Sequence, residues 1–386
     1  MPVSQQGIVL QPGQSAQVRD EISVIAIAWF PNRNPFITRF RKVPVTSPTF
    51  HIVTRRFKPR TVTAAASFNN SVTTLTLADA SYLANGDVLE TQSGERIELT
   101  AMPSLPANTI TVTRAVEGTS AAASSGSTDV LKVIGNSRTG GEINQDGYVV
   151  APVPIDQYCQ TYQQVVRVSG TVETTPAMQL APGFATPMDQ YKMEALQALM
   201  DDFETGCFYG KGEAASVSTN GRPKQKGIRT ILSAAAPGNL ITSPTNGSAY
   251  KPSDLTRDVL QIPRQGGGDP NVLIVSQDFI TGFAQWGLPL VRLVDDRTVL
   301  GVDIKTFKAP FLNDITVIEH PLLYPGTAVS LTEQEACLRL KRPWTWGEYG
   351  RRGDAAEGDF IAEGAVELDN PGHHGWVENI TGFAAN

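Results

Sequence analysis

The sequence predicts an α+β fold, because one long amphipathic helix interrupts a chain that otherwise has the pattern of short strands, turns and loops. The helix is expected from Pro187 to about Gly210. The 386 residues include 34 glycines and 26 prolines, which implies many turns. No second long helix is evident, so we expect this one to lie on a sheet of its own subunit or between subunits.

The predicted helix has start signals and a continuous apolar stripe. Thr186 is a candidate N-cap, Pro187 suits the first helical position, and Asp189 stands where a capping-box acid would reach back. At about 1.5 Å per residue the helix is about 35 Å long and behaves as a spine. Its charged residues, such as Glu204, fall mostly on other faces. The expected spine-helix core is Met193, Leu196, Met200, Phe203 and Cys207.

Composition and charge argue against several classes of protein. The formal net charge of −6 disfavours a nucleic-acid binder that works by phosphate neutralisation. The cysteines Cys159, Cys207 and Cys337 are too widely spaced to indicate a disulfide framework or a metal site. The N-terminus has no signal-peptide pattern, and no apolar run approaches the ~20 residues that span a bilayer. We expect a soluble protein of a reducing cytoplasm, without membrane association.

A Gln-rich arm, residues 1 to about 37, leads into a basic segment. From Pro31 to Arg60 the chain carries eight cations and no acid, and prolines make the segment a poor self-packer. This pattern favours electrostatic clamping onto acidic neighbouring subunits or a polyanion. The alternative is an exposed basic strand whose counter-charges lie elsewhere in the same fold. The candidate inter-subunit residues are Arg33, Arg39, Arg41, Lys42, Arg55, Arg56, Lys58 and Arg60.

Residues 61 to 140 form an island rich in Thr, Ala, Ser and Gly. Four short alternating stretches, with a tight turn at Asn85-Gly86, predict a small β-module with a thin core that projects as an inserted lobe. From Lys251 onward the pattern alternates between helix and strand. Helices are expected over Leu255–Ile262, capped by Ser253, and Gln277–Trp286, and strands over Val272–Val275, Ile315–Glu319, Ala328–Leu331, Ala336–Leu340 and Phe360–Leu368.

No catalytic or metal-binding pattern is evident, so we expect neither an enzyme nor a cofactor. Gly206 to Gly212 lacks the spacing of a phosphate-binding loop, and a helix stop accounts for it better. His373-His374 has no further ligand at useful spacing and is interpreted as a surface loop. Trp344 and Trp346 could stack a sugar or base, but a core or interface anchor is favoured.

Short strings in chain order resemble a known family over nearly the whole chain. They are Trp29-Phe30-Pro31 with Asn34-Pro35-Phe36; Leu83-Ala-Asn-Gly86-Asp87-Val88 with Thr111-Val112-Thr113-Arg114 and Glu117-Gly118-Thr119; Gln160-Thr-Tyr162-Gln163-Gln164 with Val168-Ser169-Gly170-Thr171; and Gly227-Ile228-Arg229 with Arg342-Pro343-Trp344. The chain resembles the major capsid protein of tailed bacteriophages with the Hong Kong 97-type fold, in a subfamily with a β-module inserted in the extended loop.

The resemblance implies five regions. They are an N-terminal arm (1–37), an extended loop (38–150) carrying the β-module (about 61–140), a peripheral domain (151–250) with the spine helix at 187–210, an axial domain (251–340), and C-terminal strands returning to the peripheral domain (341–386). It implies a structural protein whose hexamers and pentamers form an icosahedral head. The alternative is a phage tail or surface β-rich protein that binds glycans through Trp344 and Trp346; an enzyme with an unrecognised site comes third.

Partners are implied by the same resemblance. The subunit would associate with itself and enclose double-stranded DNA without sequence-specific binding. The chain lacks the long charged helical N-terminal region that some relatives use as a built-in scaffold, so a separate scaffolding protein is expected. A portal and a decoration protein are further expected partners. The location would be the virion capsid, with assembly in the host cytoplasm.

Overall fold

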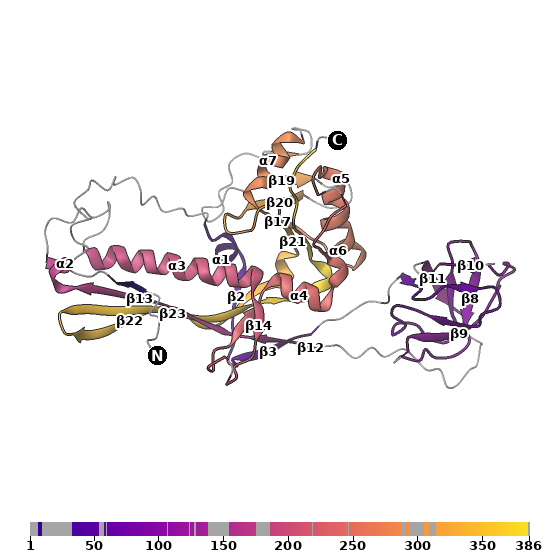
Figure 1. Cartoon of the computed structure of the whole chain (residues 1–386), viewed down its shortest axis with the longest axis horizontal. Helices are drawn as coiled ribbons and strands as arrows, with labels where there is room; N and C mark the ends of the chain where they lie inside the picture. The colour runs from indigo at the N-terminus through magenta and orange to yellow at the C-terminus, as the bar shows by residue number, and fades with distance from the viewer. Residues whose placement is uncertain are drawn as a thin grey trace. The chain divides into compact units, whose positions relative to one another are not determined.

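The computed structural model describes residues 7–9, 33–53, 58, 60–105, 107–122, 124–126, 129–137, 154–174, 186–217, 219–245, 247–286, 291–292, 305–308 and 314–384. The chain forms two compact units. The main unit comprises Met1–Thr54 and Pro154–Asn386, and the module comprises Arg55–Val153 (Figure 1). Helices and long strands occur together in the main unit, which confirms the predicted α+β class.

The spine helix is α3, Pro187–Tyr209. The amide of Asp189 donates to the hydroxyl of the N-cap Thr186 (3.2 Å), and Pro187 takes the first position. Gly210 is the C-cap and opens the hairpin of β14 (Lys211–Glu213) and β15 (Lys224–Lys226). The predicted start of the helix is confirmed, and so is the helix stop at the glycines.

A five-stranded sheet carries α3 on one face (Figure 1). Three long antiparallel strands form its centre, and a short strand adds in parallel to each edge. The central strand confirms the predicted strand with alternating apolar and acidic residues. In sheet order the strands are β1 (Gly7–Val9), β13 (Gln160–Ser169), β23 (Ala355–Leu368), β22 (Ala336–Arg352) and β2 (Arg41–Pro44).

The buried stripe of α3 is offset from the predicted one. Phe203 and Cys207 are fully buried, and Met200 packs half-buried against the same core. The prediction is wrong for Met193, which is 37% exposed, and Leu196 is only half-buried. The buried positions are Pro187, Met188, Ala195, Leu199, Phe203, Glu204, Cys207 and Phe208.

The offset follows from what the helix packs against. The predicted stripe followed the heptad spacing that suits a partner helix. In the observed stripe, every fourth residue from Ala195 to Cys207 is buried. This stripe packs on a sheet. Near its start, Ala195 packs in one cluster with Val166 and Val168 of β13. A small side chain at this point lets the helix lie close to the strand.

A seven-stranded sheet forms the other half of the main unit. Its central strand β17 is buried on both faces, which confirms the predicted buried strand. Val272 and Ile274 join the core that contains α3 residues, while Leu273 and Val275 join a second core with α7 (Gln277–Gln285). In sheet order the strands are β16 (Leu240–Ile241), β24 (Gly375–Val377), β21 (Ala328–Leu331), β17 (Val272–Val275), β20 (Asp314–Glu319), β19 (Lys305–Lys308) and β18 (Val291–Arg292).

One prediction for this half is wrong. The first helix starts at Pro252 with Lys251 as N-cap, rather than at a Ser253 cap, because proline suits the first helical position. It runs as α5 (Pro252–Leu255), the π-helical turn η4 (Thr256–Gln261) and α6 (Ile262–Gln265). Of the C-terminal strands expected to return to the peripheral domain (341–386), β22 and β23 lie in the sheet that carries α3, whereas β24 pairs in the seven-stranded sheet. The assignment of this region to the peripheral domain stays a prediction. Pairing with strands distant in sequence decides the placement of β24.

The remaining elements of the main unit are short. Strands β3 and β12 pair with each other in antiparallel fashion. Helix α4 follows the hairpin and packs in the main core through three aliphatic residues, Ile228, Ile231 and Leu232. The bounds are α1 (Pro35–Arg39), β3 (Thr49–Val53), β12 (Pro154–Tyr158), α2 (Gly170–Thr174), α4 (Ile228–Ala235), and single 3-10 turns at Pro237–Asn239, Glu333–Glu335 and Pro371–His373.

The module contains a six-stranded sheet rather than the four strands expected. The two strands that were not predicted are β4, which has only three residues, and β11, whose burial alternates only over its first four residues. One cluster of mostly aliphatic side chains forms the core. In order the strands are β4 (Thr61–Thr63), β11 (Val130–Asn136), β7 (Asp87–Glu90), β8 (Arg96–Leu99), β9 (Thr109–Thr113) and β6 (Thr74–Thr76), with a separate pair β5 (Phe68–Asn69) and β10 (Ser124–Ser125).

A buried ion pair supports this core. Both carboxylate oxygens of Glu95 accept from Arg114 at 2.6 Å, and the amides of Ala115 (3.3 Å) and Ala122 (2.9 Å) also donate to them. The guanidinium lies 5.2 Å from the ring centroid of Phe68. Burial acts to raise the pKa of Glu95, but the hydrogen bonds outweigh it and hold the pKa below its usual value.

Replacing Glu95→Gln should destabilise the module by about 3 kcal/mol, because it leaves the Arg114 charge buried and uncompensated. Hydrogen exchange of the β8 and β9 amides in the full-length chain would measure this loss. The matched control is Glu98→Gln on the adjoining strand β8, for which we expect less than about 0.5 kcal/mol. Equal exchange rates in the two variants would contradict the role given to Glu95.

Candidate inter-subunit surfaces and the joint behind them

The first part of the basic segment packs within its own subunit. Residues 35–39 form α1, with Pro35 at its start. Phe36, Ile37 and Phe40 are at most 2% exposed and belong to the main core. The expectation of a poorly packing extended segment is therefore wrong here, because three apolar side chains provide a buried stripe among the cations.

Two cations of the segment form ion pairs with acidic side chains of the same unit. The Nε of Arg33 donates to Asp201 of α3 (2.7 Å). Arg39 donates to both oxygens of Glu333 (3.0 and 3.1 Å), a two-bond pair that is stronger than a single contact. For these two arginines, counter-charges within the same fold are the better interpretation.

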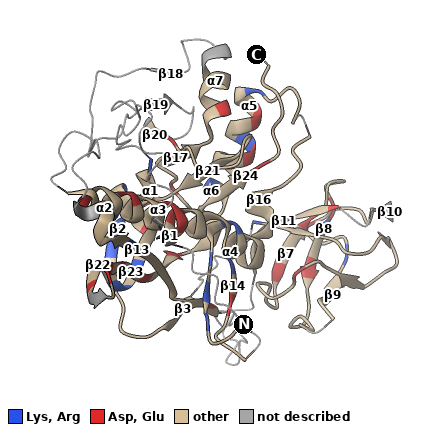
Figure 2. Ribbon diagram, turned by 60° about the vertical axis from the view of Figure 1, so that its left-hand side comes forward, with Lys and Arg blue, Asp and Glu red and all other residues tan. Residues whose placement is uncertain are grey.

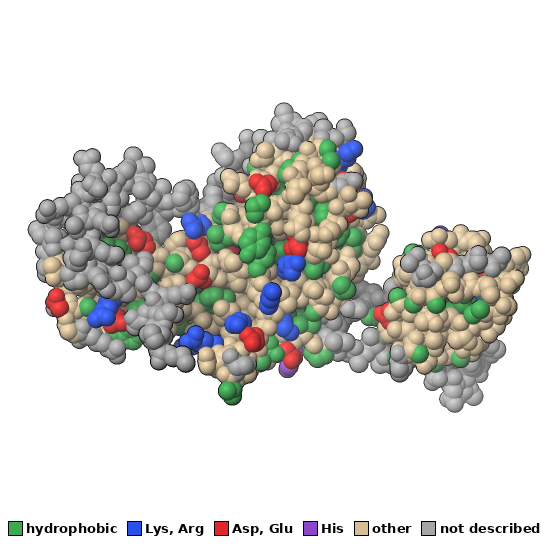
Figure 3. All heavy atoms as spheres, in the orientation of Figure 1, with side chains coloured by type: hydrophobic (Ala, Val, Ile, Leu, Met, Phe, Trp, Pro, Cys, Tyr) green, Lys and Arg blue, Asp and Glu red, His purple; other side chains and the backbone are tan. Residues whose placement is uncertain are grey.

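The other cations divide between engaged and exposed side chains. Lys42 lies over the ring of Trp344, 5.6 Å from its centroid, and Lys58 bonds Asp87 within the module (2.5 Å). On the face drawn in Figure 3, basic and acidic side chains lie next to each other on the main unit. Contact with a neighbouring subunit stays a prediction for all eight residues. Arg41 and Arg60 are exposed, and Arg55 and Arg56 lie outside the described residues.

A buried carboxylate joins three parts of the main unit. Glu204 of α3 is 0% exposed and accepts from the amides of Phe36 (2.8 Å) and Ile37 (3.5 Å) at the start of α1. Its Oε1 also lies 2.6 Å from Nε2 of His320, at the end of β20. The Leu322 amide donates to the other ring nitrogen of His320 (3.1 Å), so the proton on Nε2 points to Glu204.

The contacts of Glu204 with α1 and His320, called the Glu204 joint below, supply the N-terminal cap that α1 lacks. The N-cap Asn34 makes no side-chain capping bond, so the Glu204 carboxylate, which is remote in sequence, accepts from the exposed amides instead. It thereby fixes the start of the segment leading to β2 against both α3 and the seven-stranded sheet. Sequence reasoning missed this role because a glutamate on a helix is normally solvated. Its position between the buried Phe203 and Phe208 was the available signal.

The two tryptophans act as core anchors. The ring of Trp344 packs edge-on against Phe203 of α3, with centroids 5.5 Å apart. Trp346 packs on Phe360, and Lys192 of α3 lies over it at 4.8 Å. Both rings are thus engaged with side chains of their own subunit, which confirms the core interpretation over a sugar-stacking surface.

The paired histidines are buried, contrary to the surface-loop interpretation. His374 is 0% exposed: the Thr332 amide donates to its Nδ1 (3.2 Å), and its Nε2 donates to the carbonyl of Asp369 (3.1 Å). His373 is 9% exposed and contacts Glu335 at 2.8 Å. Burial lowers the pKa of His374 to about 4. The histidines anchor the chain just before β24, a role that only the sheet order reveals.

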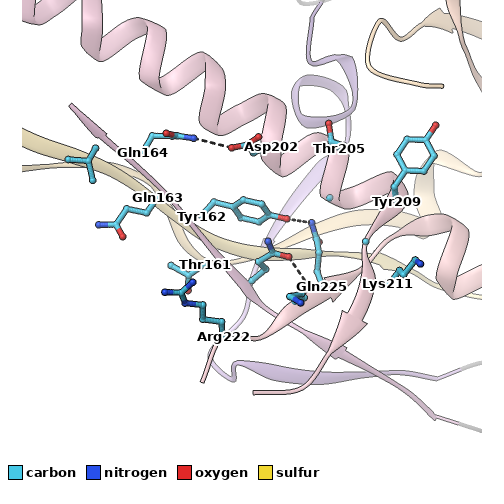
Figure 4. A pocket seen from close by; sticks show the side chains of 15 residues that line it. Thr161, Tyr162, Gln163, Gln164, Asp202, Thr205, Tyr209, Lys211, Arg222 and Gln225 are labelled. Atoms are coloured by element: carbon cyan, nitrogen blue, oxygen red, sulfur yellow. Dashed lines mark hydrogen bonds between the residues drawn. The ribbon is translucent and has the colours of Figure 1, made fainter. Parts of the chain in front are cut away.

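A groove of about 1030 Å³ lies beside β13 (Figure 4). Its walls are the edge of β13, the last turns of α3 and the β14–β15 hairpin. Gln225 donates to the hydroxyl of Tyr162 (2.8 Å), and Gln164 donates to Asp202 (3.0 Å). Burial raises the pKa of Asp202 above its usual value. The lining cations are Lys211, Arg222 and Lys224.

The main features of the chain are a long helix packed on long strands and a separate β-module, which are typical of a structural protein that acts through its surfaces. No cluster of three or more metal-binding side chains occurs among the described residues. In the same part of the chain, none of the helices combines the length and apolarity needed to cross a membrane.

The chain belongs to the SU10 major capsid protein family, whose family model matches residues 7–381. This confirms the predicted class: the protein is a major capsid protein, a structural component of a virion. No match was found among curated proteins.

Several solved structures are similar to the chain at low identity. That of Mycobacterium phage Bobi has a TM-score of 0.48 and 11% identity, covering 95% of this chain and 96% of that one. That of Mycobacterium phage Adephagia has a TM-score of 0.46 and 11% identity, covering 98% of each. The holo-SrpI encapsulin complex of Synechococcus elongatus gives 0.45 and 10%, covering 97% and 96%. These weak likenesses add nothing to the family assignment.

Replacing Glu204→Ala should lower the free energy of unfolding of the unassembled subunit by about 3–5 kcal/mol, because the α1 amides and His320 lose their buried acceptor. Denaturant unfolding measures this difference. The control Glu194→Ala, on a less buried face of the same helix, should cost less than about 0.5 kcal/mol. A similar small loss in both variants would contradict the joint.

The buried His374 should make the fold sensitive to acid. Its pKa of about 4 in the folded chain lies below the usual histidine pKa of 6.5, so its contribution to stability is present above pH 6.5 and lost as pH falls toward 4. The contribution lost between pH 7 and pH 5 should be about 2 kcal/mol. Unfolding midpoints at both pH values should show a smaller change in His374→Gln than in the wild type; an identical change would contradict the assignment.

Proposed function

We propose that the protein is the building block of an icosahedral phage head whose subunits have the Hong Kong 97-type fold. The observation that carries the proposal is the family match over residues 7–381. The helix α3 on its long sheet suits the expected peripheral domain, and the seven-stranded sheet suits the axial domain. The module at Arg55–Val153 suits the β-module of an extended loop.

In this proposal, hexamers and pentamers of the chain enclose double-stranded DNA without sequence-specific binding, in agreement with the net charge of −6. A separate scaffolding protein, a portal and a decoration protein are the partners, and assembly takes place in the host cytoplasm. The role is structural, with no enzymatic step and no cofactor. The N-terminal arm of residues 1–37 and the extended loop contact neighbouring subunits.

The surroundings of the cations within the subunit support a narrower choice of inter-subunit residues. Arg33 and Arg39 already bond acids of their own unit. Reversing their charge would therefore disturb folding as well as any contact between subunits. The exposed Arg41, at the start of β2, and Arg60, in the module, are better candidates for acidic neighbours.

The recombinant wild type should sediment as capsomers or shells, whereas Arg41→Glu/Arg60→Glu should remain folded yet sediment as smaller species, because the reversed charges meet acids on a neighbour. Analytical ultracentrifugation and the thermal unfolding midpoint separate assembly from folding. Lys132→Glu, an exposed reversal on the strand that pairs with β4 beside Arg60, should assemble normally and tests whether Arg41 and Arg60 are specifically needed. A wild type that stays monomeric at every salt concentration and with its scaffold would refute the proposal.

A further inference from the structure

Within the described part of the chain, strand β13 has a stretch of unpaired edge beside the groove. On one side it pairs with β23 along its whole length, Gln160–Ser169. On the other side, β1 pairs only with Val165–Arg167. Among the described residues no strand covers the remaining stretch, 160–164, and this stretch lines the groove (Figure 4). An open strand edge presents backbone N–H and C=O groups to which a second extended chain can pair.

The walls of the groove carry an excess of positive charge. Three cations and one acid line it. The acid, Asp202, already accepts from Gln164, and Lys224 contacts Glu213 (2.8 Å). Strand β14 carries Lys211 and Glu213, and β15 adds Lys224 and Lys226, so basic residues outnumber acidic ones on the hairpin (Figure 2). The positive electrostatic potential of these walls favours a negatively charged ligand in the groove.

We propose that this groove binds an acidic, extended segment of a separate protein by strand addition to residues 160–164. The backbone of the segment would pair with β13, and its carboxylates would face Lys211 and Arg222. The basic segment of this chain has the same sign as the groove, so a copy of that segment is disfavoured as the occupant. The inference goes beyond the capsid role, because it assigns a partner surface to the individual subunit.

The strand edge favours a polypeptide over nucleic acid as the acidic occupant. Nucleic acid binds through cations that neutralise its phosphates and has no need of a strand edge. The floor of the groove instead offers the peptide groups of five consecutive β13 residues and uncharged side chains such as Thr161 and Gln163. At about 3.3 Å per residue these peptide groups match the repeat of another extended backbone.

The test uses the full-length, unassembled chain and a fluorescein-labelled peptide of sequence TEVEVET. Fluorescence anisotropy should show saturable binding that weakens with salt. The neutral peptide TQVQVQT should bind at least about tenfold more weakly, and so should TEVEVET with alternate amides N-methylated, because it cannot pair with a strand edge. Absence of saturable binding, or equal affinity for all three peptides, would overturn the proposal.

Variants locate the site. Lys211→Glu/Arg222→Glu should weaken binding of TEVEVET at least about tenfold, while the exposed reversal Lys132→Glu in the module should leave it unchanged. As a second measurement on the wild type, saturating peptide should slow hydrogen exchange of the amides in residues 160–164. Unchanged exchange there, or equal loss of binding in the control variant, would overturn the assignment.

Competition distinguishes the other occupants. An excess of the Lys211→Glu/Arg222→Glu variant, whose own groove does not bind the peptide, would identify a second copy as the occupant if it displaced the peptide from the wild type. Displacement by a short DNA duplex at comparable concentration would identify a general polyanion site. Either result overturns the proposed separate acidic protein, whereas failure of both competitors supports it. These outcomes do not depend on shell formation, so they can be told apart from a failure of the capsid proposal.

Discussion

The buried carboxylate of Glu204 is the constraint on which the arrangement of the main unit depends. A charge removed from water costs several kcal/mol unless donors surround it. Here the donors come from α1 and from His320, so the carboxylate is satisfied only when the start of the basic segment, the spine helix and the end of β20 meet. Three parts of the chain that are remote in sequence are thus positioned by one side chain.

Around this joint the main unit is built as two sheets that share a core. Alternate residues of β17 point into the core with α3 and into the core with α7, so the seven-stranded sheet links the two. Two of the cations that the sequence analysis assigned to contacts with neighbouring subunits instead form ion pairs within the main unit, Arg33 with Asp201 and Arg39 with Glu333. These internal pairs contribute to the order of the single subunit.

Features that depend on residues close together in the sequence could be predicted, and features that depend on contacts between distant segments could not. Local signals identified the spine helix with its Thr186 cap, the buried strand at 272–275 and the helix beginning at Gln277, because caps and periodicity act within a few residues. Resemblance in chain order led to the capsid family, which the family model confirms. The joint at Glu204, the buried His374 and the groove beside β13 depend on partners from distant segments, so no local pattern marked them.

By itself, the sequence determined the class of the protein, its long helix, the position of its β-rich module and most strands of its second half. The class follows from the resemblance of short strings in chain order, and the elements depend on propensity, capping and alternation, which are properties of neighbouring residues. Only the tertiary structure decided which face of α3 is buried, where the counter-charges of the arginines lie and to which sheet β24 belongs. The physical reason is that the burial and the ion pairs of a residue depend on its neighbours in space. In these cases the neighbours in space are distant in the sequence.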